Sequence, residues 1–269
     1  MQFSIITPSF RGSDWLKLCI ASVADQCVEV EHIVQDSCSD DGTLEWLPRD
    51  PRVKAFVEKD AGMYDAINRG LRRASGEILA CLNADEQYLP GTLAAVDDCF
   101  RQHPEAEVVF GDVLVVGRDG GYLRSRQASV PRRYHTWVSD NLSISSCGTF
   151  FRRSLIEKRG LFFDPRLQSL GDVVWMLKLI EQRVPMKLLG QFTSVFAETG
   201  QNFGWGPRTK EERAGLVATA PAWSRGVRPL IVLHYRLRRL LAGHYFQKPF
   251  RYSLYTLASP AARVTMNAA

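Results

Sequence analysis

Short apolar, β-branched segments alternate with segments of helical periodicity over the first hundred residues of the chain. The predicted strands are residues 3–7, 32–36, 53–57 and 77–82, and the predicted helices are residues 13–26, 43–47, 64–73 and 92–101. This alternation is typical of a parallel sheet that helices cover on both faces. The pattern therefore predicts an α/β fold whose central, mostly parallel sheet is Rossmann-like and flanked by helices.

The pattern changes after Glu107. We expect a longer strand at residues 108–116, a hairpin-type turn into a strand at 122–126, an irregular stretch at 127–145, a helix at 170–182 and a strand at 186–197. These elements predict one domain over residues 1–205, made of the halves 1–105 and 106–205. Residues 206–269 are predicted to form a basic, helical C-terminal extension.

Polar clusters follow three of the predicted strands. They are Thr7-Pro8-Ser9, Asp36-Ser37 and Asn83-Ala84-Asp85-Glu86. Ligands of open α/β sheets bind beyond the carboxyl ends of the strands. We therefore expect a ligand site where these clusters meet.

Two acids at strand ends are candidates for its chemistry. Asp85 suits Mg²⁺ or Mn²⁺, because these ions prefer carboxylate oxygen and keep positions open for phosphate. The alternative for Asp85 is a polar strand end that caps the next turn. Asp36 can accept hydrogen bonds from a base or a ribose, or it can form an Asx-turn in the turn-rich residues 37–42.

Two further acids lie at predicted helix starts. Gly62 can open a helix whose amides attract a diphosphate, but Asp65 in its first turn would repel phosphate. Asp65 is better suited to orient a ribose or a basic side chain, or to cap the helix. Asp172 lies in a mostly apolar run, where burial of an unpaired carboxylate would be costly. N-capping of the following helix and service as a general base would each explain this acid, and the two roles are compatible if the side chain faces the cleft.

Together these segments resemble the ordered motifs of family 2 glycosyltransferases. The motifs are residues 3–10 (FSIITPSF), 32–36 (HIVQD) with 39–43 (SDDGT), 62–70 (GMYDAINRG) and 82–86 (LNADE), followed more weakly by 148–153 (GTFFRR) and Gly171-Asp172, to about Gly200. Each motif is short, but four in order with family-like spacing are specific. Within the family the chain is most similar to bacterial enzymes that build cell-surface polysaccharide.

The resemblance implies an A-type glycosyltransferase fold, with residues 1–105 as the nucleotide-sugar-binding half and 106–205 as the acceptor half. It implies inverting, hexosyltransferase-type transfer from a nucleotide-diphosphate sugar to a saccharide or polyprenyl-linked acceptor. Asp172 would be the base, and Asp85 would bind Mn²⁺ or Mg²⁺. The implied donor-binding residues are Thr7, Pro8, Ser9, Asp36, Asp65, Asn68, Asn83 and Ala84. The implied acceptor-binding residues are Ser146 and Trp175.

The chain departs from the family pattern at three places. Asn83 replaces the first acid of the Asp-x-Asp metal motif, which leaves one charge fewer on the metal. Ser146-Cys147 stands where His-Gln is expected before Gly-Thr-Phe-Phe. Residues 199–202 (TGQN) offer amides and a hydroxyl where some relatives have a metal-binding His. An Asp36 contact would favour a pyrimidine N–H, and hence UDP or dTDP.

Charge is unevenly distributed. The net charge is +5, but from Arg208 onward eleven Lys and Arg accompany two acids, so this part carries +9 and the rest −4. In residues 229–243, leucines at helical spacing stand beside Arg236, Arg238 and Arg239, with six aromatic residues in or near this stretch. The pattern fits a helix packed on the domain with a solvated basic edge, or an interfacial helix at an anionic membrane surface. No segment resembles a nucleic-acid-reading module.

Targeting signals also bear on location. The start of the chain does not resemble a signal peptide, and no run approaches the ~20 apolar residues of a membrane span. We expect a cytoplasmic protein, peripheral on the inner face of the plasma membrane if the interfacial helix forms. The six cysteines lack a Cys-x-x-Cys pair, so most are expected to be buried and reduced.

Other protein classes fit less well. An NAD-type oxidoreductase would show Gly-x-Gly-x-x-Gly after the first strand, and a nucleotidyltransferase a Gly-rich basic loop. Residues 9–12 (SFRG) match neither. A non-catalytic sugar-nucleotide-binding or scaffold protein of a polysaccharide assembly pathway stays as the alternative.

Overall fold

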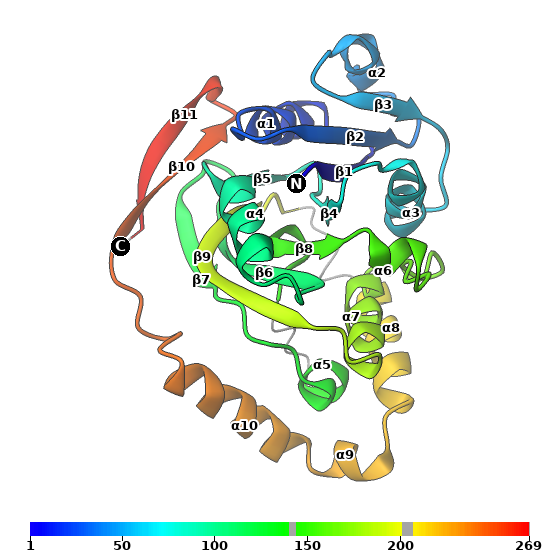
Figure 1. The fold of residues 1–269 in the computed structure, drawn as a ribbon, viewed down its shortest axis with the longest axis vertical. Helices are drawn as coiled ribbons and strands as arrows, with labels where there is room; N and C mark the ends of the chain where they lie inside the picture. Colours follow the sequence, from blue (N-terminus) through cyan, green and yellow to red (C-terminus); the bar gives the residue numbers. More distant parts are fainter. Residues whose placement is uncertain (140–143, 201–206, 269) are drawn as a thin grey trace.

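The computed structural model describes residues 1–139, 144–200 and 207–268. In this part of the chain a nine-stranded sheet has the order β3-β2-β1-β4-β8-β6-β9-β5, with β7 paired to β6 (Figure 1). The strands are β1 (Phe3–Ser9), β2 (Val30–Asp36), β3 (Lys54–Val57), β4 (Ile78–Cys81), β5 (Glu86–Tyr88), β6 (Val108–Val116), β7 (Tyr122–Arg126), β8 (Thr149–Arg152) and β9 (Met186–Ala197).

Most strands of this sheet run in one direction. Strands β3, β2, β1 and β4 are parallel neighbours, and β6 is parallel to β9. The exceptions are β8, which is antiparallel to β4 and β6, together with β5 and β7. The predicted α/β fold with a mostly parallel sheet is confirmed.

Helices cover both faces of the sheet. They are α1 (Ser13–Ala24), α2 (Thr43–Trp46), α3 (Met63–Arg73), α4 (Thr92–Gln102), α5 (Arg133–Val138), α6 (Ser154–Glu157) and α7 (Gly171–Glu181), with 3-10 turns η1 (Leu47–Arg49) and η2 (Ser146–Gly148). Within residues 1–200 the sequence patterns located the longer elements but missed the short β5, β8, α5 and α6.

Side chains along β1 pack into two separate core clusters, which lie between the sheet and different helices. Ile6 packs with residues of α3 and α7 in one core cluster, whereas Phe3 and Ile5 pack with α1 and α4 in another. Helix α3 lies close to β1 because Gly70 has no side chain, and a Cβ there would approach a methyl carbon of Ile6 to 2.4 Å. The register pairs Ser9 with Asp36, so both residues lie at the carboxyl edge of the sheet.

The C-terminal extension is helical only in its first part. It comprises α8 (Pro207–Ala218), α9 (Ala222–Gly226) and α10 (Arg228–Leu241), followed by a hairpin of β10 (Phe250–Thr256) and β11 (Ser259–Ala268). Figure 1 shows the helices running from beside α7 past α5 towards this hairpin. The hairpin corrects the expectation of an all-helical extension. Tyr252 and Leu254, two residues apart on β10, are both buried against β6 and β9. Residues two apart lie on the same face of a strand, so an extended β10 brings both side chains to this core.

Candidate active site

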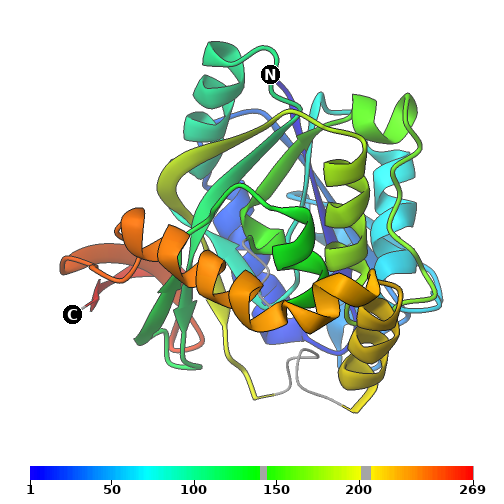
Figure 2. The ribbon, with the colours of Figure 1, turned by 90° about the horizontal axis from the view of Figure 1, so that it is seen from below.

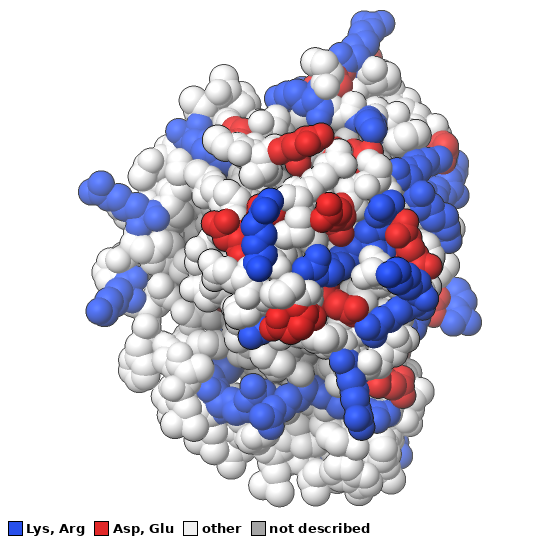
Figure 3. Space-filling model, in the orientation of Figure 1, with Lys and Arg blue, Asp and Glu red and all other residues white. Residues whose placement is uncertain are grey.

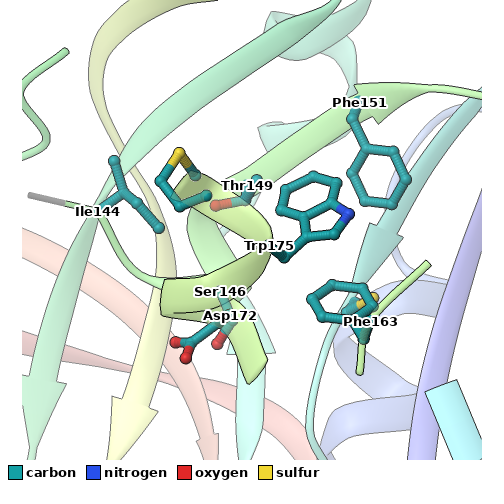
Figure 4. A pocket seen from close by; sticks show the side chains of 9 residues that line it. Ile144, Ser146, Thr149, Phe151, Phe163, Asp172 and Trp175 are labelled. Atoms are coloured by element: carbon teal, nitrogen blue, oxygen red, sulfur yellow. The ribbon is translucent and has the colours of Figure 1, made fainter. Parts of the chain in front are cut away.

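A small cavity lies where α7 begins, beside the end of β4. It is lined by Cys81, Ile144, Ser146, Thr149, Phe151, Phe163, Asp172, Trp175 and Met176 (Figure 4). Its volume of about 20 Å³ is room for about one water. The fold thus brings together Asp172, Ser146 and Trp175, three predicted site residues, and places them beside the strand that leads into Asp85.

Asp172 lies in the first turn of α7, and its carboxylate is held from two sides. Its Oδ1 accepts a hydrogen bond from the Val173 N–H at 2.8 Å and faces the Tyr64 hydroxyl at 3.4 Å. The same hydroxyl accepts the N–H of Asp172 at 3.3 Å. Burial raises the pKa of Asp172, while the hydrogen bonds from Val173 and Tyr64 oppose the shift. Asp172 is therefore not the N-cap of α7, because the helix begins at Gly171 with Leu170 at its N-cap, and the N-capping alternative is wrong. The carboxylate instead lines the cavity from the first turn of the helix.

Tyr64 connects the Gly62–Gly70 motif with Asp172. Its ring is buried and stacks on Phe163 at 5.6 Å, with an angle of 15° between the planes. Gly171 lies against this ring, and a Cβ there would come within 2.6 Å of two ring atoms. The motif at residues 62–70 does not show by itself which residue Tyr64 contacts. Its contact with Asp172 depends on the tertiary structure.

Trp175 and Asn68 both hold the wall of the cavity. The Trp175 indole N–H donates to the carbonyl of Leu161 at 2.6 Å, and the ring stacks on Phe163 at 5.1 Å. The Asn68 amide donates to the Phe163 carbonyl at 2.8 Å and accepts the Phe163 N–H at 3.0 Å. Figure 4 shows Asp172 and Ser146 at one end of the cavity and the aromatic rings at the other. Trp175 and Asn68 thus have structural partners, and their predicted sugar contacts gain no support from this geometry.

Asp36 is engaged inside the carboxyl edge of the sheet. It is fully buried and accepts hydrogen bonds from the Ser9 hydroxyl at 2.8 Å, the Ser39 N–H at 2.7 Å and the Ser39 hydroxyl at 2.8 Å. This arrangement favours the turn-forming alternative, and it removes the argument for a pyrimidine that rested on a free Asp36 carboxylate. The Thr7 hydroxyl is likewise buried, 2.9 Å from His32 Nε2. Pro8, which stands between Thr7 and Ser9 in β1, is also buried.

An exposed aromatic ring lies beyond the carboxyl end of β1. Phe10 is 51% exposed, with the Arg11 guanidinium carbon 4.9 Å and the Lys59 ammonium 5.1 Å from its ring centre. An aromatic face beside cations suits a nucleobase and its phosphates. Phe10 ends the first family motif, but its exposure is a property of the fold that the motif does not show.

The turn that carries Asp85 is closed by Glu86. The Asn83 N–H donates to Glu86 Oε2 at 2.7 Å, and the Glu86 N–H donates to the Asn83 carbonyl at 3.0 Å. Burial, and then the charge of Asp85, raise the pKa of Glu86 to about 8. Asn83, Ala84 and Asp85 in this turn are partly exposed. Glu86 is thus a positioning residue that the sequence analysis left without a role.

The donor set of this turn fits a magnesium-type site completed by substrate. Mg²⁺ is commonly held by one or two carboxylates together with substrate phosphates, and Asp85 supplies such a carboxylate. Within the described residues, no group of three or more His, Cys, Asp or Glu is placed to hold a metal by itself. Residues 201 and 202 of the segment compared with a metal-binding His lie outside the described residues.

Asp65 and Glu212 act at helix starts. Asp65 accepts the Ala61 N–H at 3.1 Å, which supports the capping alternative, and it pairs with Arg69 at 2.8 Å, which supports the alternative that it orients a basic side chain. Glu212 of α8 accepts the N–H groups of Gln168, Ser169 and Leu170 at 2.7, 3.0 and 3.0 Å. Glu212 thereby ties the C-terminal extension to the backbone directly before Asp172.

Two other expectations can be compared with the structure. Cys19, Cys81, Cys99 and Cys147 are buried, whereas Cys27 and Cys38 are exposed, and all six are free thiols. The prediction that most cysteines are buried is confirmed. Across the described ranges, no helix combines the length and the apolar character that a membrane span needs.

The fold and the position of the site define an α/β protein whose polar groups gather beyond the carboxyl ends of parallel strands. The family described as "Glycosyl transferase family 2" matches residues 4–160, which is more than half of the chain. The chain therefore belongs to glycosyl transferase family 2, as the sequence motifs predicted.

One relative by sequence and two solved structures of similar fold are among the known proteins that match the chain. The chain is 36% identical over 121 residues to the "PGL/p-HBAD biosynthesis glycosyltransferase" of Mycobacterium bovis (strain BCG / Pasteur 1173P2); the match covers 42% of this chain and 47%, about half, of that protein. Its fold is similar to that of S. aureus TarS 1-349 in complex with UDP-GlcNAc, with a TM-score of 0.63 and 17% identity over 92% of this chain and 76% of the other. It is also similar to the mannosyltransferase PcManGT from Pyrobaculum calidifontis in complex with GDP-Man and Mn²⁺, with a TM-score of 0.53 and 18% identity over 90% and 79% of the two chains. These two structures confirm the expected A-type fold.

Proposed function

We propose that the chain is an inverting glycosyltransferase that moves a hexose from a nucleoside-diphosphate sugar to a hydroxyl of a saccharide or polyprenyl-linked saccharide. The observation that carries the proposal is the Asp172 carboxylate. It is held at a cavity by Tyr64 and the Val173 N–H, and burial raises its pKa. A raised pKa makes this carboxylate a stronger base for an alcohol proton.

In the proposed reaction, Asp172 takes the proton of the acceptor hydroxyl while the oxygen of that hydroxyl attacks the anomeric carbon. The new C–O bond forms on the face opposite the leaving group. The bond between the anomeric carbon and the phosphate oxygen breaks, and the nucleoside diphosphate leaves with the bonding electrons. In this proposal Ser146, which lines the same cavity as Asp172 (Figure 4), contacts the acceptor.

On the donor side, the proposal uses the groups beyond the ends of β1 and β4. The base stacks on Phe10, and the diphosphate lies near Asn83, Ala84 and Asp85. Asp85 would hold Mn²⁺ or Mg²⁺, which neutralises charge on the leaving diphosphate. The neighbours of similar fold bind UDP-GlcNAc and GDP-Man, which supports a nucleotide-sugar donor. UDP is the first candidate to test because the TarS neighbour binds UDP-GlcNAc, and dTDP is tested beside it because it also carries a pyrimidine base.

The proposed place of the reaction is the cytoplasm, at the inner face of the plasma membrane. A lipid-linked acceptor would be met there, and the basic extension supports this location.

Thermal shift of the purified chain tests the donor site. UDP, dTDP, GDP and CMP are compared, each with Mn²⁺ and with EDTA, on the native chain and on Asp85→Ala. A ligand at ~100 times its Kd adds about 2.7 kcal/mol, which raises Tm by several degrees. A shift that requires both metal and Asp85 supports the site. Its absence for every nucleotide, on a folded sample, contradicts the proposal.

Asp172→Asn then separates a catalyst from a sugar-nucleotide-binding scaffold. We expect release of nucleoside diphosphate in the presence of acceptor to fall by about 10²–10⁴-fold with unchanged donor binding, the range for loss of a general base. Asp14→Asn, which changes an exposed carboxylate on α1, is the matched control and keeps full activity. Equal turnover in Asp172→Asn and the native chain would show that Asp172 is not the base.

A further inference from the structure

The apolar side of α10 faces solvent. Leu230, Leu233, Leu237, Leu240 and Leu241 are 64%, 52%, 48%, 45% and 87% exposed. With 3.6 residues per turn, these five leucines fall within an arc of about 100° around the helix. A surface helix ordinarily turns such a stripe towards the core. In α10 the orientation is reversed.

Contacts outside the leucine arc hold the helix in this orientation. Tyr235 is buried and packs edge-on against His135 of α5, with 5.4 Å between the ring centres. His234 Nδ1 lies 3.0 Å from His135 Nε2, and the Arg239 guanidinium donates to the Gln127 carbonyl at 3.3 Å. Rolling the helix to bury its leucines would break these contacts.

The surroundings of the leucine arc are basic. The chain has no Asp or Glu after Glu212, but it has nine Lys and Arg there. Around the helix, Arg236 and Arg238 fall on either side of the leucine arc. A groove on the same helix is lined by Arg228, Pro229, Val232, Leu233 and Arg236. Figure 3 shows Lys and Arg beside uncharged surface at the end of the molecule where α10 lies in Figure 1.

Exposed aromatic side chains stand at both ends of α10. Trp223 of α9 precedes it and is 57% exposed, and Tyr245 and Phe246 follow it with 54% and 74% exposure. Figure 2 shows α9 and α10 one after the other across this side of the molecule. Amphipathic aromatic rings are enriched at membrane–water interfaces.

We propose that this face of α10 is a docking surface for a bilayer of anionic phospholipids. The helix lies in the plane of the interface, with its leucines at the acyl boundary and its arginines at the headgroup phosphates. Charge decides between a bilayer and a second copy of the chain. Two such faces packed together would oppose arginines to arginines, with no acid on either helix.

Docking does not depend on the proposed transfer reaction, but it would bring the chain to a lipid-linked acceptor. Helix α10 belongs to the extension whose first helix, α8, is tied by Glu212 to the backbone before Asp172. A chain bound to a bilayer through α10 would therefore hold the cavity with Asp172 near the same membrane surface.

Co-sedimentation of the full chain with lipid vesicles tests this proposal. We expect binding to phosphatidylcholine vesicles that contain about a quarter of phosphatidylglycerol, and little binding to pure phosphatidylcholine. Binding should weaken strongly at about 0.5 M salt, because the Debye length is then only a few ångströms. Arg236→Gln should weaken binding about fivefold, which corresponds to ~1 kcal/mol for one basic residue near an anionic surface.

A matched pair of variants isolates the apolar contribution. Leu233→Gln/Leu237→Gln should weaken vesicle binding roughly tenfold or more. Leu123→Gln/Leu188→Gln, which changes two leucines of 50% and 41% exposure elsewhere, should bind as the native chain does. Nucleotide thermal shifts should be unchanged in both variants, so this test and the donor-site test fail separately.

Three results would overturn the proposal. They are no binding to anionic vesicles, equal binding to neutral vesicles, and equal binding by the α10 variant and the native chain. Sedimentation velocity tests whether the face instead binds a second copy of the chain. A dimer that the α10 variant loses, in a chain that binds no vesicles, would assign the face to self-association.

Discussion

Replacing Gly171 by alanine tests the packing that positions Asp172. A Cβ at residue 171 would lie 2.6 Å from Cε2 and Cζ of Tyr64 and 2.7 Å from Cδ2, distances that real Cβ contacts do not reach. The ring cannot move aside easily, because it is buried and stacked on Phe163. The variant must therefore shift Tyr64, α7 or both.

The magnitude follows from the cost of overpacking a well-packed core. We expect Gly171→Ala to lower the free energy of unfolding by about 1–3 kcal/mol, and hence Tm by roughly 3–10 °C. Turnover should fall as well, since Asp172 follows directly and shares its hydrogen bonds with the displaced Tyr64. Tm is measured by calorimetry, and kcat/KM is measured with the donor that the thermal-shift panel identifies.

Gly215→Ala is the matched control. Gly215 lies within α8, and a Cβ there meets no atom within 4 Å. Alanine in a helix interior is favoured over glycine by up to about 1 kcal/mol, so this variant should be slightly more stable than the native chain. Equal stability and equal kcat/KM in Gly171→Ala and the native chain would refute the argument that Gly171 and Tyr64 position the base.

Three further substitutions give separate tests. Tyr64→Phe removes a hydrogen bond to a carboxylate whose pKa burial already raises, so the acidic limb of the kcat/KM profile should move to higher pH; an unmoved limb would mean that the hydroxyl does not act on Asp172. Burial raises the folded-state pKa of Glu86 from 4.5 to about 8, so its proton stabilises the fold fully below pH 4.5 and this contribution is lost as the pH rises to about 8. Urea unfolding at several pH values should therefore show a weaker loss of stability with rising pH in Glu86→Gln, and parallel curves would contradict the buried proton. Glu212→Ala leaves three N–H groups before Asp172 without their acceptor and should cost about 1–3 kcal/mol in urea unfolding, against little change in Glu211→Ala; equal values for the two would remove the proposed tie to α8.

The sheet was predictable because its signals are local. Residues 3–7 and 32–36 are apolar runs closed by polar residues, and burial on both faces of a parallel strand requires such a run. Polar residues at the strand ends then gather at one edge, whatever the details of packing. The family motifs, the α/β class and the edge of the sheet at which the candidate site is sought therefore follow from the sequence alone.

Partners within the site were not predictable in the same way. Asp36 and Asn68 have the residue types and spacing of ligand-binding groups, yet the fold gives them Ser9, Ser39 and the Phe163 backbone as partners. Hydrogen-bond partners far apart in the chain depend on which side chains meet after packing, and sequence spacing carries no information about that.

The C-terminal region shows the same division most clearly. Its sequence determined that a leucine- and arginine-rich helix forms there, observed as α10, because helical spacing and charge are local properties. Only the tertiary structure decided that the leucines face solvent, since the contacts of His234, Tyr235 and Arg239 with the domain fix the rotation of α10 about its axis. Periodicity defines an apolar side of a helix, but only the packing of the other side determines whether that apolar side is buried or exposed.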